Sequence, residues 1–201
     1  MRELLLGGGR ALILVAHPDD ETIWMGGTIL INPQIKWTVF SLCRGDDLDR
    51  APKFKKVCNV YGAKAIISNL EDEEQLNISE SLPEIRRRVL RELPSRRFDY
   101  IFTHAYNGEY GHPRHKGVHR ALKTLAEEKK LSASRFFCFN YELDDRNGRI
   151  EPKIKSSFIN NLTQNILSRK KHIINEIYGF KKSSFEYRSC ARQESFKELI
   201  L

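Results

Sequence analysis

Short apolar runs alternate with amphipathic stretches over the first 145 residues of the chain. Five runs are rich in β-branched or aromatic residues, which is typical of buried strands. They cover residues 11–15, 37–42, 65–67, 99–103 and 136–143. Between them, apolar side chains recur with the period of a helix that covers one face of a sheet. The alternation predicts a three-layer α/β fold around a mostly parallel sheet, formed by residues 1–201 as a single domain.

Capping and turn residues bound the predicted helices. Helices are expected over residues 22–32, from Pro52 to the closing Gly62, from a Ser81 cap to Leu93, and after His115. Residues 158–178 are predicted to be mainly helical, residues 145–148 to form a turn, and residues 179–201 to have mixed structure. The pair Gly26-Gly27 indicates close packing, because each glycine weakens a helix by about 1 kcal/mol relative to alanine.

Two polar clusters follow predicted strands at the point where each strand ends. The run Ala11–Val15 leads directly into Ala16-His17-Pro18-Asp19-Asp20-Glu21, and the fourth strand leads to Gly111-His112-Pro113-Arg114-His115. Open α/β sheets place their chemistry at the carboxyl ends of strands. Because parallel strands bring these ends to one edge of the sheet, we expect the two clusters to meet.

The side chains in the two clusters are suited to a metal ion. Histidine nitrogens and carboxylate oxygens from two loops are typical ligands of zinc with one position open to water. Asp19 and Asp20 are adjacent, so in a turn they point in different directions. One carboxylate can then bind metal while the other acts as general base, and the spacing alone does not decide between them.

Other residues near the clusters have simpler interpretations. Tyr110 and Asn107 lie in the loop before His112 and are candidates for substrate contact. His104 ends a strand and is expected to be a packed residue that supports the site, and His119 is expected at the surface of the following helix.

Composition narrows the class of protein. The formal net charge of +8 raises nucleic-acid binding as an alternative, but no recognisable binding module accompanies the basic residues, which we interpret as solvated faces. The four cysteines are scattered, as expected for buried thiols in a reducing compartment. Arg10 interrupts the apolar N-terminal stretch, so a signal peptide is not favoured. We therefore expect a cytoplasmic protein without a transmembrane segment and without nucleic acid as a partner.

The motifs resemble those of the LmbE-like (PIG-L) family of zinc-dependent N-deacetylases. The segment from His17 to Glu21, followed by Gly26-Gly27-Thr28, resembles the first motif of that family. Thr103-His104 and the segment from Gly111 to His115 resemble the second motif. Further similarities are Cys43-Arg44-Gly45, Arg50 and Glu194-Ser195-Phe196, so the resemblance extends over nearly the whole chain.

The resemblance implies a Rossmann-like fold, one Zn²⁺ ion and removal of acetyl groups from N-acetylglucosamine-containing conjugates. Carried onto matching positions, it implies His17, Asp20 and His115 as zinc ligands and Asp19 as general base. It further implies that His112 protonates the amine or stabilises the oxyanion, and that Arg50 contacts the substrate. The implied partner is a small amino-sugar substrate, and several relatives form homo-oligomers.

The chain departs from the family pattern at one position. Many members have an aspartate between the two histidines of the second motif, where this chain has Arg114. An arginine would tend to lower the basicity of a neighbouring histidine, which leaves the behaviour of His112 open. A non-catalytic carbohydrate- or nucleotide-sugar-binding protein on the same fold is the main alternative function.

Overall fold

The computed structural model describes residues 2–73, 75–144, 146, 148–153, 155 and 158–201. Its main sheet has the strand order β1-β9-β10-β6-β5-β2-β3-β4. Five neighbouring strands are parallel: β6 (Ser132–Phe139), β5 (Arg97–Thr103), β2 (Gly9–Val15), β3 (Ile35–Cys43) and β4 (Lys64–Leu70). Strand β10 (Gln193–Leu199) is antiparallel to both β6 and β9 (Phe158–Asn161), and β1 (Arg2–Glu3) extends the sheet beside β9.

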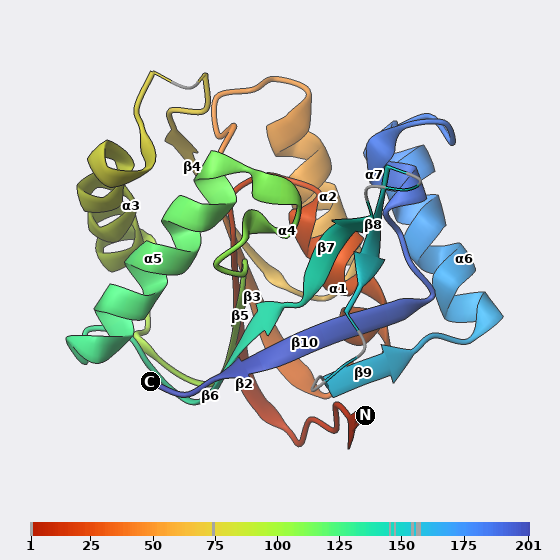
Figure 1. Ribbon diagram of the computed structural model, residues 1–201, viewed down its shortest axis with the longest axis horizontal. Coiled ribbons are helices and arrows are strands. Elements are labelled where there is room, and N and C mark those ends of the chain that lie inside the picture. Colours follow the sequence, from red (N-terminus) through yellow and green to blue (C-terminus); the bar gives the residue numbers. More distant parts are fainter. Residues whose placement is uncertain (1, 74, 145, 147, 154, 156–157) are drawn as a thin grey trace.

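Helices cover both faces of this sheet (Figure 1). One face carries α1 (Asp20–Ile31), α2 (Arg50–Val60) and α6 (Gln164–His172), which continues into the π-helical turn η1 (Ile173–Ile177). The other face carries α3 (Ile78–Glu92) and α5 (Pro113–Glu127). Two short helices, α4 (Gly108–Gly111) and α7 (Phe185–Arg188), and the hairpin of β7 (Tyr141–Asp144) and β8 (Arg149–Pro152) complete the fold. The predicted three-layer α/β architecture with a mostly parallel sheet is confirmed.

Strand β2 lies between β5 and β3 and separates two apolar cores. Its side chains alternate: Ile13 and Val15 pack into the core under α1 and α2, and Leu12 and Leu14 into the core under α3 and α5. All four are fully buried. This two-sided burial explains the uninterrupted apolar run in the sequence. It also holds the residues that follow Val15 at a fixed place on the carboxyl edge of the sheet.

Helix α1 is kinked at Met25, and the glycine pair beyond the kink packs closely, as predicted. A Cβ atom on Gly27 would lie 2.4 Å from the side chain of Leu162. The backbone amide of Gly27, just after the kink, donates to the buried Glu194 carboxylate at 2.8 Å. The same carboxylate pairs with the fully buried Lys170 ammonium at 2.7 Å. The C-terminal β10 and α6 therefore brace the first helix of the site.

Several sequence predictions are wrong in detail. The cap of α3 is Asn77, which forms a capping box with Glu80, so Ser81 lies inside the helix. Residues 136–143 do not form one strand, because β6 ends at Phe139 and β7 begins at Tyr141. Residues 158–161 are strand β9, and the helix begins only after the Thr163 cap. Of the predicted turn at 145–148, Asp145 and Asn147 lie outside the described residues.

The predicted buried thiols are confirmed, since Cys43, Cys58, Cys138 and Cys190 are all buried and free. Within the described part of the chain, no helix combines the length and apolar character needed to cross a membrane.

Candidate active site and metal centre

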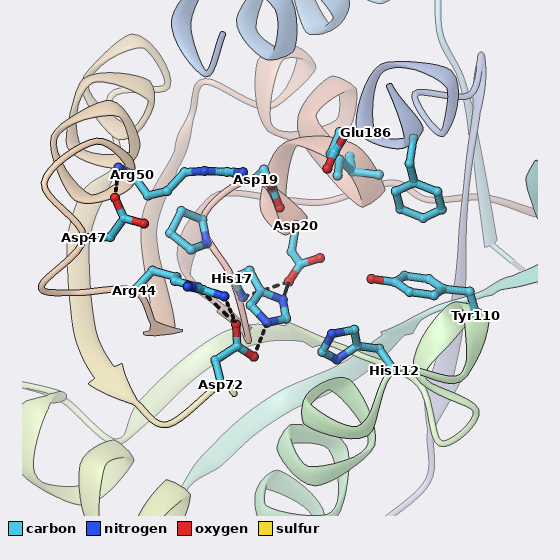
Figure 2. A pocket seen from close by; sticks show the side chains of 13 residues that line it. His17, Asp19, Asp20, Arg44, Asp47, Arg50, Asp72, Tyr110, His112 and Glu186 are labelled. Carbon is cyan, nitrogen blue, oxygen red and sulfur yellow. Dashed lines mark hydrogen bonds and ion pairs between the residues drawn. The ribbon is translucent and has the colours of Figure 1, made fainter. Parts of the chain in front are cut away.

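The two polar clusters meet in a pocket of about 360 Å³ at the carboxyl edge of the sheet. Its lining includes His17, Asp19 and Asp20 from the segment after β2, and Tyr110 and His112 from the segment after β5. Figure 2 shows these side chains converging on one space. The parallel register of β2 and β5 brings the two segments together, as expected from the sequence.

Three side-chain atoms form a nearly equilateral triangle at the base of the pocket. His17 Nδ1 lies 3.3 Å from Asp20 Oδ2, and His115 Nε2 lies 3.4 Å from the same oxygen. The two histidine nitrogens are 3.3 Å apart. Ligands about 2.0–2.1 Å from a tetrahedral zinc ion lie about 3.3–3.4 Å from one another. The triangle therefore has the dimensions of one face of a zinc coordination tetrahedron.

Each corner of this triangle is also held from outside. His17 Nε2 lies 2.8 Å from Asp72 Oδ1, and His115 Nδ1 lies 2.6 Å from Glu109 Oε2. The indole Nε1 of Trp24 donates to Asp20 Oδ1 at 2.9 Å. These outer contacts orient the inward-facing atoms, as partners of metal-binding histidines and carboxylates commonly do.

The ionisation of Asp20 fits a ligand role. Burial disfavours its charged form, but the charges of His115 and His104 outweigh burial and hold the pKa of the Asp20 carboxyl well below its usual value. An ionised carboxylate beside two histidine nitrogens is a donor set that suits zinc. The residues present therefore fit the metal that the sequence suggests.

Two further groups of potential ligand atoms surround the triangle, namely His17–Cys43–Asp72 and His104–Glu109–His115. In each group the carboxylate already bonds to neighbouring side chains. Asp72 pairs with Arg44 Nη2 at 2.9 Å, and Glu109 lies within hydrogen-bond distance of both histidines of its group. We therefore interpret these groups as hydrogen-bond networks around the triangle.

Asp19 lies beside the triangle in an unusual backbone conformation, with φ of 116°. Its amide donates to the buried Glu21 carboxylate at 3.1 Å, and its own carboxylate accepts a hydrogen bond from Arg50 Nη1 at 2.9 Å. Burial and the neighbouring charge of Asp20 raise the pKa of the Asp19 carboxyl well above its usual value, and Arg50 partly opposes this. Asp19 thus has the increased proton affinity that a general base needs.

His112 forms the side of the pocket at the start of α5. Its Nδ1 accepts a hydrogen bond from the Arg114 amide at 3.2 Å, which makes it the N-cap of that helix. Its ring stacks on His115 with centroids 4.6 Å apart. Burial and the charges of His115 and His17 lower the pKa of His112 to about 3. With Nδ1 accepting, the neutral ring carries its proton on Nε2 and can donate from there.

The Arg114 side chain bonds to a loop and not to His112. The guanidinium is buried and turns toward the loop before α3, where it pairs with Glu71 and donates to the Leu76 carbonyl at 2.9 Å. Arg114 thus helps to anchor this loop, and the loop supplies Asp72 to the site.

The candidate substrate residues have different positions. Arg50 and Tyr110 line the pocket together with Arg44 and Glu186. Asn107 does not line it, because its amide donates to the Tyr141 carbonyl at 2.9 Å and to the Glu109 carbonyl at 3.3 Å. The structure thus brings Arg50 and Tyr110 into the pocket but not Asn107.

The remaining histidines also differ from each other. His104 is fully buried and supports the site, in line with the sequence-based prediction. The prediction of a surface position for His119 is wrong: it is buried, and its Nδ1 lies 3.0 Å from the His104 carbonyl.

Sequence reasoning missed Asp72, Glu109 and Trp24. Asp72 belongs to an acidic stretch that is typical of a solvated turn, and Glu109 occurs in a glycine-containing loop. The one sequence feature that could have identified Asp72 and Glu109 is that each follows a strand, β4 or β5, at the same edge of the sheet as the two motifs. Trp24 lies four residues after Asp20, on the same side of helix α1.

Comparison with known proteins agrees with this class of fold and site. The family described as PIG-L: GlcNAc-PI de-N-acetylase matches residues 12–126, which include both histidine motifs. The chain belongs to the PIG-L family. Among curated proteins, it is 27% identical over 135 residues to the N-acetylglucosaminyl-phosphatidylinositol de-N-acetylase of Bos taurus, covering 62% of this chain and 53% of the relative.

An uncharacterized protein of Acanthamoeba polyphaga mimivirus is 25% identical over 127 residues, with 55% of each chain covered. The chain thus spans about half the length of the curated relatives it matches.

Solved structures confirm the fold. The deacetylase Dbv21, which acts on the A40926 pseudoaglycone, matches with a TM-score of 0.65 at 15% identity, covering 93% of this chain and 95% of that one. The 4-carboxy-2-hydroxymuconate hydratase GalB of Pseudomonas putida matches with a TM-score of 0.66 at 14% identity, covering 96% of both chains. Because a hydratase and a deacetylase share this fold, the reaction has to be argued from the site.

Proposed function

We propose that this chain is a zinc-dependent N-deacetylase that releases acetate from an N-acetylated amino sugar or glycoconjugate. The observation that supports this most is the triangle of His17 Nδ1, Asp20 Oδ2 and His115 Nε2, with the Asp19 carboxylate beside it. Membership of a deacetylase family supports the reaction class, and the name of the bovine relative supports an N-acetylglucosamine-containing substrate.

His17, Asp20 and His115 are the residues that would hold the metal. A bound zinc ion supplies Lewis-acid chemistry, which polarises an amide carbonyl and increases the acidity of water. Asp19 is the general base that takes a proton from the attacking water molecule. It can return that proton to the leaving nitrogen, so that water and amide become acetate and a free amine.

Arg50 and Glu21 hold Asp19 in place for this role. The Arg50 guanidinium donates to the Asp19 carboxylate at 2.9 Å and keeps it beside the pocket. The Glu21 carboxylate accepts the backbone amide of Asp19 and so fixes its backbone. Orienting a base in this way removes part of the entropic cost of proton transfer.

His112 is proposed to stabilise the oxyanion that develops on the acetyl oxygen. Its Nδ1 accepts from the Arg114 amide, which leaves Nε2–H to point a hydrogen bond at developing negative charge. A neutral ring can donate this hydrogen bond but is a poor acid, so of the two roles that the resemblance implies we propose oxyanion stabilisation.

Tyr110 and Phe185 form an apolar side of the pocket, with ring centroids 4.9 Å apart. Arg44 and Arg50 lie on the other side in Figure 2. The combination suits a ligand with an apolar acetyl group and several polar hydroxyls.

The proposal is tested by adding zinc to the purified chain and measuring acetate release. The substrates are N-acetylglucosamine, its oligomers, and its nucleotide-linked and inositol-linked conjugates. We expect acetate and free amine in equal amounts from at least one of them. A non-catalytic binding protein would bind a member of the panel without releasing acetate. A hydratase would instead add water to an unsaturated acid, so 4-carboxy-2-hydroxymuconate is included as a counter-substrate. Binding or hydration without any acetate release would overturn the proposal.

A further inference from the structure

The carboxylate of Glu109 lies at the centre of a fully buried hydrogen-bond network behind the metal triangle. Its Oε2 is 2.6 Å from His115 Nδ1 and 2.8 Å from His104 Nδ1. Its Oε1 accepts the Ala105 amide at 2.8 Å. The side chains of Glu109, His104 and His115 are all 0% exposed, so no solvent competes for these bonds.

The network starts from a group whose proton cannot move. The backbone amide of Ala16 donates to His104 Nε2 at 3.0 Å, which requires a lone pair on that nitrogen. The proton of the neutral His104 ring is therefore on Nδ1, from which it is donated to Glu109. Glu109 then accepts from His104 and has only accepting capacity to offer His115.

The same reasoning gives the position of the ring proton of His115, the proposed metal ligand. An ionised carboxylate accepts hydrogen bonds and donates none, so His115 must carry its proton on Nδ1. That leaves the lone pair of His115 on Nε2, the atom that faces Asp20 Oδ2 and His17 Nδ1. The rings of His104 and His115 stack with centroids 3.7 Å apart, which fixes the plane of the ligand.

The backbone at Glu109 is held in an unfavourable conformation to achieve this. Its φ and ψ are 57° and −62°, a combination that a residue with a side chain rarely adopts. Gly108 and Gly111, both with positive φ, provide the turns on either side. The carboxylate, which makes three hydrogen bonds at its buried position, compensates for this strain.

We infer that Glu109 is a positioning residue that fixes the ring orientation and tautomer of His115, so that Nε2 is presented to the metal before the metal arrives. The inference rests on the zinc site of the proposed function. It extends that site from the ligand through Glu109 and His104 to the backbone of Ala16, where the first motif begins.

The tautomer is tested on the metal-free wild-type chain. At alkaline pH, where both rings are neutral, side-chain ¹⁵N NMR of the histidines is expected to show His104 and His115 protonated on Nδ1 and unprotonated on Nε2. Alkaline pH is needed because, against the effect of burial, the Glu109 and Asp20 carboxylates raise the pKa of His104 to about 9. A His115 ring protonated on Nε2 would overturn the inference. This measurement needs neither zinc nor substrate and does not depend on whether any variant folds.

Zinc affinity, measured by competition with a chelator, tests the consequence. Glu109→Gln has only one accepting oxygen, so it cannot satisfy both histidines and the Ala105 amide. We expect its zinc Kd to rise roughly 10–100-fold, the usual effect of losing a partner behind a metal ligand. Glu127→Gln, in the exposed part of α5, is the matched control and should bind zinc like the wild type. A Glu109→Gln value within about threefold of the wild type would contradict the positioning role.

Glu109→Gly separates positioning from folding. Glycine relieves the positive φ, which offsets part of the stability lost with the three hydrogen bonds, and thermal unfolding shows whether the variant is folded. We expect its zinc affinity to remain weak, because the carboxylate is absent. Recovery of wild-type affinity in Glu109→Gly would show a structural role only. Zinc binding with the expected tautomer but no acetate release would instead count against the proposed function and leave this inference standing.

Discussion

The floor and the rim of the pocket are built differently. We call His17, Asp20 and the fully buried His115 that contacts both of them the floor, and Arg44 and Arg50 the rim. His115 is 0% exposed and Asp20 is 3% exposed, whereas the side chains of Arg44 and Arg50 are 44% and 31% exposed. Each floor residue turns one polar atom toward the triangle and has its other polar atom bonded on the far side. The rim residues each make an ion pair that solvent reaches.

This difference indicates a division of labour. Groups that carry chemistry must be held within a fraction of an ångström, which burial and hydrogen bonds at the far side achieve. Groups that recognise a substrate can adjust on long side chains. We therefore expect substitutions in the floor to change metal binding and turnover. A rim substitution that leaves the contact between Arg50 and Asp19 intact, such as one at Arg44, should change mainly KM.

The largest effect is expected for Asp20→Ala. It removes one corner of the triangle, so zinc affinity should fall by more than the roughly 100-fold that loss of an outer partner costs. Zinc per chain after dialysis, measured by elemental analysis, should be close to zero. Asp47→Ala at the edge of the pocket is the control and should retain zinc. Full zinc occupancy in Asp20→Ala would contradict the assignment of the floor.

Asp19→Asn should separate chemistry from metal binding. The variant keeps the size of the side chain and its contact with Arg50 but loses the base. We expect kcat to fall about 10²–10⁴-fold while zinc content stays at the wild-type level. Steady-state acetate release and elemental analysis on the same sample decide the matter. Unchanged turnover would refute Asp19 as the base.

His112→Ala should have a smaller effect on turnover. Removing a single oxyanion donor usually lowers kcat by about 10²–10³-fold, and zinc should be retained because His112 is not a corner of the triangle. The alanine variant also loses the N-cap of α5, so His112→Asn, which can still cap the helix, is the matched control for stability. If both variants kept wild-type kcat, the oxyanion role would be excluded.

The smallest effect is expected at the rim, for Arg44→Ala. Its ion pair with Asp72 is partly exposed, and its loss should leave the bond between Asp72 and His17 in place. We expect KM to rise up to about tenfold, which corresponds to about 1.4 kcal/mol, with kcat nearly unchanged. A large fall in kcat at constant KM would show that the rim takes part in the chemistry. It would contradict the distinction between a catalytic floor and a substrate-binding rim.

The floor could be predicted from the sequence because it follows local rules. A buried strand that ends in His17-Pro18-Asp19-Asp20 and another that leads to His115 must meet if the strands are parallel, and they do. The same reasoning placed helices between the strands and identified the packed Gly26-Gly27 pair.

Outer partners were not predictable in this way. Glu109 and Asp72 come from loops, and only the three-dimensional path of each loop shows which acidic residue turns inward. His119 was misplaced because its side of α5 turns toward β6, where it approaches Cys138 at 3.4 Å. Strand β9 is four residues long and pairs with β10, which is more than thirty residues further along the chain. Such non-local pairing leaves no periodic signal in a short segment.

The most direct test of the zinc centre is anomalous diffraction at the zinc edge from crystals grown with Zn²⁺. We expect one peak bonded at about 2.0–2.2 Å to His17 Nδ1, the Asp20 carboxylate and His115 Nε2, with Asp19 beside it and not bound. A peak on the other side of His17, between its Nε2, Cys43 and Asp72, or no peak at the triangle at full zinc loading, would contradict the proposed centre.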